Sequence, residues 1–111
     1  MKKVFLGQFE ELVLLAILRL EDNAYGLTIR QILEEATQRP VSIGAIYATL
    51  DRLERKWLVE SRQGEATPER GGRAKRYFKV SGAGVRALND TNLARRKIFN
   101  GLEPDWNSEI R

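Results

Sequence analysis

The sequence of 111 residues contains neither cysteine nor histidine, and these two absences exclude much of the usual equipment of an enzyme. Without cysteine there is no disulfide bond, no thiolate metal site and no cysteine nucleophile. Without histidine the chain lacks the commonest general base and the commonest zinc ligand, which excludes a Ser-His-Asp arrangement. We therefore expect no catalytic residue, no metal site and no cofactor.

Long apolar runs are also missing from the sequence. The longest unbroken run, Leu12 to Leu18, has seven residues, whereas a membrane-spanning helix needs about 18. The apolar residues Val4 to Leu6 are followed by polar positions and do not resemble a secretory signal. We expect one globular domain in the cytoplasm, with no membrane partner.

Basic residues concentrate in the middle of the chain. Residues 39–79 carry ten basic and five acidic side chains, whereas residues 1–38 carry four basic and six acidic ones. The densest basic stretch, Arg70 to Lys79, contains five basic residues and no acidic residue. A positive patch confined to one segment is typical of a nucleic-acid surface, and the alternative is a solvated basic hairpin.

Apolar periodicity predicts four helices and two short strands. The expected helices cover residues 8–20, 25–38, 43–57 and 82–102, and the expected strands cover 58–62 and 74–80. The first helix is apolar on nearly all sides, which indicates that a second chain covers part of it. Ser42 and Ser81 are expected to cap the third and fourth helices, and Trp57 is expected to fill the core. The order predicts a mainly α fold with a small β-hairpin, a winged helix-turn-helix followed by a C-terminal helix.

The third helix would be the DNA-recognition helix. Its predicted outward face combines small and polar residues with two basic side chains, Arg52 and Lys56. Small residues let a helix approach the floor of the major groove. The β-hairpin would be the wing of this fold, and its loop carries basic residues beside a glycine. These basic residues would reach the minor groove or the flanking phosphates. The predicted DNA-binding residues are Ser42, Gly44, Ala45, Tyr47, Thr49, Arg52, Arg70, Gly72, Arg73 and Lys75.

Several of these residues have a second interpretation from the sequence. Ser42 is needed as a helix cap whether or not it contacts DNA, and Ala45 could be plain helix surface. Tyr47 lies at the edge of the apolar stripe, so it fits a core tyrosine with a wet hydroxyl as well as a phosphate contact. Arg52 has no acidic residue three or four positions away on its helix, which argues against an ion pair along that helix. A freely solvated arginine stays open as the alternative to a DNA contact.

Five stretches of the sequence, taken together in their order and spacing, specifically match one protein family. They are residues 9–18 (FEELVLLAIL), 24–26 (AYG) with Ile29, 42–53 (SIGAIYATLDRL), 68–78 (PERGGRAKRYF) and 81–84 (SGAG). Over residues 5–102 the chain resembles the PadR-like transcriptional regulators of the short C-terminal type. The resemblance implies a homodimeric bacterial regulator of transcription, expected to be a repressor, that binds double-stranded DNA at a palindromic operator.

The resemblance also implies how two copies would associate. The last helix of one chain would pack against the first helix and N-terminal segment of the other. The expected interface residues are Phe5, Phe9, Leu12, Val85, Leu88, Phe99 and Leu102. The sequence leaves open whether a small hydrophobic effector binds between the two chains. The candidate lining residues for such a site are Phe5, Phe99 and Trp106. We expect a DNA-binding domain over 5–80, a dimerisation helix over 81–102 and an irregular tail over 103–111.

Two other classes of function stay open at this point. A winged helix without DNA specificity would be a protein-interaction module, and a DNA-free, salt-insensitive complex with another protein would identify it. An enzyme would use carboxylates such as Glu34, Glu35, Glu60 and Glu69. Because Glu34 and Glu35 are adjacent on a helix and point apart, and no nucleophile or phosphate loop accompanies them, the sequence disfavours this reading.

Overall fold

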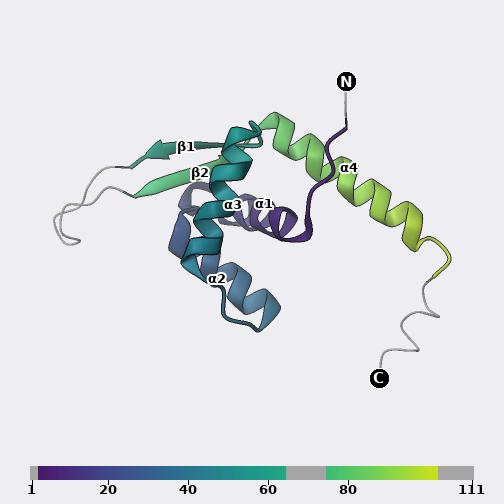
Figure 1. Cartoon of the computed structure of the whole chain (residues 1–111), viewed down its shortest axis with the longest axis horizontal. Helices are drawn as coiled ribbons and strands as arrows, with labels where there is room; N and C mark the ends of the chain where they lie inside the picture. The colour runs from purple at the N-terminus through teal and green to yellow at the C-terminus, as the bar shows by residue number, and fades with distance from the viewer. Residues whose placement is uncertain (1–2, 65–74, 103–111) are drawn as a thin grey trace.

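The computed structural model describes residues 3–64 and 75–102. Its elements are α1 (Gln8–Leu20), a 3-10 turn (Glu21–Asn23), α2 (Gly26–Thr37), α3 (Ile43–Arg55), β1 (Val59–Gln63), β2 (Arg76–Val80) and α4 (Gly82–Phe99). The first three helices pack together, the hairpin projects from one side of them, and α4 leads away on the opposite side (Figure 1). This is the mainly helical winged-helix arrangement that the sequence predicts.

The predicted beginnings of the helices agree with the structure to within one residue. α1 has the predicted bounds, and the N–H of Gly7 donates to Glu10 Oε1 at 3.0 Å in the manner of a capping box. Ser42 caps α3 by accepting the N–H of Ala45 at 3.0 Å, and Ser81 caps α4 by accepting the N–H of Gly84 at 3.0 Å. The serine caps were therefore predicted correctly.

The helix ends differ more from the prediction. α2 ends at Thr37 because Gln38 takes up a left-handed conformation, and its N–H closes the helix on the carbonyl of Glu34. α4 ends at Phe99, three residues before the predicted end at Leu102. No helix in the described ranges combines the length and apolar character needed to cross a membrane.

The prediction that Trp57 fills the core is wrong. α3 ends at Arg55, and Trp57 is 80% exposed with a φ of 63°. The N–H of Trp57 bonds to the carbonyl of Glu54, and the N–H of Leu58 bonds to the carbonyl of Leu53. This pair of hydrogen bonds is a Schellman motif, which turns the chain so that Leu58 enters the core and Trp57 faces outward.

Replacing Trp57 with glycine is expected to raise the free energy of unfolding by about 1 kcal/mol, because a left-handed backbone strains any residue that has a Cβ. Urea denaturation of the purified protein measures the change. Arg55→Gly is the matched control, since it puts glycine at a helical position two residues earlier and should lower stability by about 1 kcal/mol. A loss of stability in Trp57→Gly would show that the exposed ring has a packing role.

The hairpin attaches the wing to the helices. β1 and β2 are antiparallel, with Val59 opposite Val80 and Ser61 opposite Phe78. Phe78 and Val80 are buried and Lys79 between them is exposed, which confirms the alternation read from the sequence. The side chains of one face therefore enter the core, and those of the other face are left for solvent or a partner.

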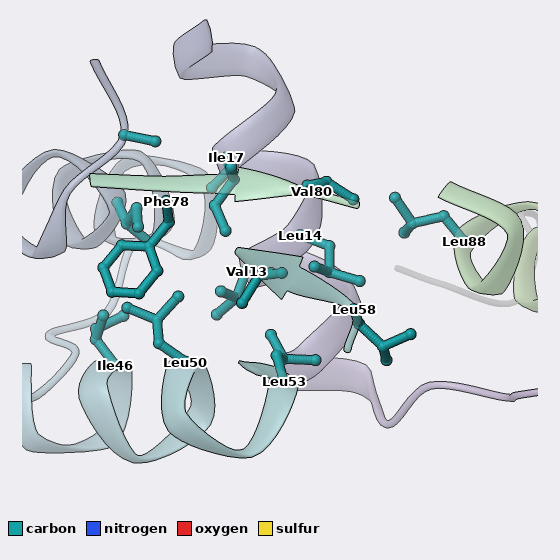
Figure 2. Packing of buried hydrophobic residues seen from close by; sticks show 14 of the residues in the cluster. Val13, Leu14, Ile17, Ile46, Leu50, Leu53, Leu58, Phe78, Val80 and Leu88 are labelled. Atoms are coloured by element: carbon teal, nitrogen blue, oxygen red, sulfur yellow. The ribbon is translucent and has the colours of Figure 1, made fainter. Parts of the chain in front are cut away.

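One hydrophobic core joins the helices and the hairpin. Figure 2 shows side chains from α1, α3, β2 and α4 converging on a common interior. The labelled core residues are Val13, Leu14, Ile17, Ile46, Leu50, Leu53, Leu58, Phe78, Val80 and Leu88. Because α3 is held on its inner side by this core, its opposite side faces outward in a fixed orientation.

The N-terminal segment ties α4 to α1. The N–H of Leu6 donates to Thr91 Oγ1 on α4 at 3.0 Å. Arg95 on α4 forms an ion pair with Glu11 on α1, and this partner raises the pKa of the Arg95 guanidinium. α4 is thus fixed to the N-terminal segment at its middle and to α1 in its C-terminal half.

Candidate nucleic-acid interface

α3 presents one exposed side, which we call the outer face. Its N-terminal half carries small side chains and a tyrosine, and its C-terminal half carries basic ones. The outer face consists of Gly44, Ala45, Tyr47, Ala48, Arg52, Arg55 and Lys56. A Cβ added to Gly44 would meet no atom within 4 Å, so this end of the helix is open to an incoming partner.

The prediction that Thr49 lies on the outward side of α3 is wrong. Thr49 is 2% exposed, and its Oγ1 accepts a hydrogen bond from Arg52 Nη2 at 3.2 Å. The exposed side is centred opposite Ile46 and Leu50, whereas the predicted face lay on the flank nearest α1. Thr49 therefore supports Arg52 from the buried side and does not present its own side chain at the surface.

Ala48 and Arg55 are outer-face residues that the predicted site does not contain. Both are exposed, and both lie about half a turn from the buried Leu50 and Leu53. The sequence signal that identifies both residues is their angular position on the helix, opposite the apolar stripe. The prediction instead followed the positions that directly precede that stripe, which rotated the predicted face by roughly a quarter of a turn.

Tyr47 is partly exposed and packs against its own chain. It is 37% exposed, and its ring lies against the beginning of α2, where a Cβ added to Gly26 would come within 2.4 Å of the Tyr47 hydroxyl oxygen. Glycine at position 26 therefore makes room for this ring. The close approach fixes Tyr47 at the junction of α2 and the outer face of α3.

Arg52 does have an acidic neighbour, contributed by another helix. Its Nε lies 3.8 Å from Glu10 Oε2 of α1, and Lys56 Nζ donates to the same oxygen at 3.0 Å. Burial raises the pKa of Glu10, but the hydrogen bond from Gly7 and the two cations outweigh it, so the pKa stays below its ordinary value. The interpretation of Arg52 as a freely solvated side chain is therefore wrong.

The part of the hairpin from Lys75 to Phe78 packs against the residues that precede α2. Lys75 Nζ lies 4.3 Å from the centre of the Tyr25 ring, and the Tyr25 and Tyr77 rings meet edge to face at 5.6 Å. The N–H of Phe78 donates to the carbonyl of Ala24 at 2.9 Å. Lys75 is the one predicted wing residue within the described parts of the chain, whereas Arg70, Gly72 and Arg73 lie outside them.

Arg76 of β2 connects the wing to α3. It pairs with Glu54 and lies 3.4 Å from Asp51, which are the two acidic residues of α3. In consequence, the acidic charges of this helix are directed toward the hairpin. Within residues 3–64 and 75–102, Arg55 on the outer face forms no ion pair.

The predicted dimer-interface residues fall into three groups by exposure. Phe5, Val85 and Leu102 are exposed, with Phe5 at 61%. Leu88 is 7% exposed and belongs to the core of its own chain, because it lies on the side of α4 that packs against the hairpin. The remaining three residues, Phe9, Leu12 and Phe99, are half-buried.

Further exposed apolar residues lie on the same two helices. Leu15 and Leu18 on α1 are 47% and 46% exposed, and Leu93 and Ile98 on α4 are 47% and 75% exposed. The predicted interface did not include these four. The apolar character of α1 on all sides was the sequence signal, and Leu15 and Leu18 are the part of it that the chain itself leaves uncovered.

The described residues show no cluster of three or more carboxylates that could hold a metal ion. Trp106, a candidate lining residue for an effector, lies outside these residues.

A family model supplies the decisive comparison. The model of the transcriptional regulator PadR-like family matches residues 14–90, which include α2, α3, the hairpin and half of α4. The chain belongs to the PadR-like family. It is therefore a DNA-binding transcriptional regulator with a winged-helix fold, and not an enzyme.

Solved structures resemble this PadR-like regulator over most of its length. A PadR-like transcription factor from bacteroid fragilis is 28% identical with a TM-score of 0.72, and the match covers 86% of this chain and 87% of that one. RosR of H. salinarum is 26% identical with a TM-score of 0.68, covering 95% and 86%. A PadR family regulator from Eggerthella lenta, 23% identical with a TM-score of 0.66 and covering 90% and 83%, shares the fold. No curated protein sequence matches the chain significantly.

Proposed function

We propose that two copies of this regulator form a homodimer that binds a palindromic operator in the cytoplasm and represses transcription. Each copy would insert the outer face of α3 into one major groove and lay its wing on the backbone or in the minor groove. The observation that carries the proposal is the outer face itself, whose small residues stand beside basic ones on a helix held rigidly by the core.

The first half of the outer face suits close approach to base edges. Gly44, Ala45 and Ala48 are exposed and short, so the helix backbone can come near the floor of a groove about 12 Å wide. An alanine methyl group can contact the methyl group of thymine. Recognition of the DNA base sequence would therefore depend on this half of α3.

The second half of the outer face suits phosphates and guanine edges. Arg52 and Arg55 are exposed one turn further along the helix. Because Arg76 pairs with Asp51 and Glu54, these carboxylates are turned from the path of the DNA backbone. Arg70, Gly72, Arg73 and Lys75 of the wing would add phosphate or minor-groove contacts.

The exposed apolar residues of α1 and α4 support association with a second copy. Leu15, Leu18, Leu93 and Ile98 would be covered if α4 of one protomer packed against α1 of its partner, together with Phe5, Val85 and Leu102. A two-fold dimer presents its two α3 helices in inverted orientation, so the operator would be a palindrome with half-sites about one helical turn apart. Occupying such a site within a promoter would block transcription.

The proposal is tested by selecting bound sequences from randomised duplexes and measuring fluorescence anisotropy at two salt concentrations. We expect enrichment of an inverted repeat and a steep loss of affinity with salt. Ala48→Glu, which places a carboxylate at the centre of the outer face, should reduce operator affinity at least tenfold through like-charge repulsion with phosphate. Gln31→Glu makes the same charge change at an exposed position of α2 and should have a much smaller effect.

Two results would contradict the proposal. Equal effects of Ala48→Glu and Gln31→Glu would show that α3 does not enter the groove. Absence of DNA binding at low salt, together with a salt-insensitive complex with another protein, would favour the protein-interaction module.

A further inference from the structure

The carboxylate of Glu10 lies under the flank of the proposed DNA-binding helix. Glu10 belongs to α1, and its side chain is 11% exposed. Oε1 accepts the N–H of Gly7 at 3.0 Å. Oε2 accepts a hydrogen bond from Lys56 Nζ at 3.0 Å and lies 3.8 Å from Arg52 Nε. One nearly buried acidic group therefore serves two cations of the outer face.

Arg52 is held by two neighbours at once. Nε lies beside Glu10, and Nη2 donates to the buried Thr49 hydroxyl at 3.2 Å. The side chain is nevertheless 46% exposed, so the rest of the guanidinium is accessible from outside. Two fixed contacts reduce the number of orientations that the guanidinium can take, so less freedom is lost when it binds a base edge or phosphate.

Lys56 is bound more directly than Arg52. Its ammonium group lies at hydrogen-bonding distance from Glu10, and its side chain is half exposed. Because the hydrogen bond from Gly7 and the two cations hold the pKa of Glu10 below its ordinary value, the carboxylate is ionised at neutral pH. Its negative charge therefore opposes any phosphate that approaches this end of α3.

We propose that Glu10 is a positioning and specificity-determining residue of the DNA interface, which fixes the guanidinium of Arg52 and withholds the ammonium of Lys56 from phosphates. This inference rests on the proposed function. Phosphate contacts supply nearly all nonspecific affinity, whereas base contacts distinguish sequences. A carboxylate that neutralises one phosphate-seeking cation and orients another side chain lowers affinity for random DNA more than affinity for the operator.

Glu10→Gln tests the charge of this residue and leaves its cap intact, because glutamine also accepts the Gly7 N–H at this helix position. The full chain is titrated onto the selected operator and onto a scrambled duplex between 50 and 200 mM salt. For the scrambled duplex we expect the slope of log affinity against log salt to steepen by about 0.9, equivalent to roughly threefold over this range for one added phosphate contact. The ratio of operator affinity to scrambled affinity should fall.

Glu11→Gln is the matched control. Glu11 is the next residue of α1, its side chain is also 11% exposed, and it pairs with Arg95 of α4 instead of with α3. It should leave the salt slope for scrambled DNA unchanged. Thermal unfolding of both variants verifies that they are folded at the temperature of the titration.

Lys56→Met separates the two roles of Glu10. In the Glu10→Gln background it should return the salt slope to that of the unmodified protein, because the released cation has been removed. Equal slopes and equal specificity ratios for Glu10→Gln and Glu11→Gln, in a protein that still selects an operator, would overturn the role of Glu10 alone. If the unmodified protein selects no operator sequence, the proposed function itself is overturned.

Discussion

Gly84→Ala is expected to lower the free energy of unfolding by about 3 kcal/mol, the upper range for forcing one extra group into a packed interior. A Cβ at position 84 would lie 2.2 Å from the carbonyl oxygen of Leu58 and 2.6 Å from Cγ1 of Val80. The first of these contacts is with backbone, which cannot rotate away. The first turn of α4 would have to move off the hairpin, and a large part of the stability of a small domain would be lost.

Gly82→Ala is the matched control for this change. It lies in the same turn of α4, and its added Cβ would find its nearest neighbour, Arg86 Nη1, at 3.6 Å, an ordinary contact. Because alanine favours a helix over glycine, this variant should be unchanged or slightly more stable. Urea denaturation of both proteins gives the comparison, and equal midpoints would show that α4 does not pack on the hairpin in solution.

Ile98→Glu is expected to convert the dimer to monomers and to reduce operator affinity by at least two orders of magnitude. Ile98 on α4 is 75% exposed, and the proposed dimer would bury it against the partner. A buried, unpaired carboxylate is costly. A monomer reads one half-site, so it loses the advantage of having the second half-site already nearby.

Sedimentation analysis and operator titration measure these two effects of Ile98→Glu. Leu27→Glu provides the control, because Leu27 on α2 is 50% exposed and lies on neither α1 nor α4. It should leave the association state unchanged. A protein carrying Ile98→Glu that remains dimeric would contradict the proposed interface. It would not bear on the DNA-binding role of α3, which Ala48→Glu tests separately.

The local features of the fold were predictable because they depend on neighbouring residues. The apolar run of α1, the serine caps at Ser42 and Ser81, and the alternation of Phe78, Lys79 and Val80 all agree with the structure. Each involves groups within a few residues of one another. The family resemblance read from the same stretches is confirmed by the match over residues 14–90.

The incorrect predictions for Trp57, Thr49 and Arg52 have a common physical origin. Extending the helical period beyond Arg55 puts Trp57 in the core, but the chain reverses there through hydrogen bonds to the carbonyls of Leu53 and Glu54. The same period puts Thr49 outside, but Thr49 is 2% exposed in the folded chain. Arg52 was judged against acids of its own helix, although its partner Glu10 is 42 positions earlier in the sequence.

The family, the order of helices and hairpin, and the helix that carries the outer face could all be predicted from the sequence, because period, caps and motifs are properties of short segments. Three features became visible only in the folded chain: which side of α3 is exposed, which cations pair with carboxylates, and which apolar residues of α1 and α4 are left uncovered. These outcomes depend on contacts between segments far apart along the chain. Burial and ion pairing are set by how the helices pack, and helical period alone does not specify the rotation of one helix against another.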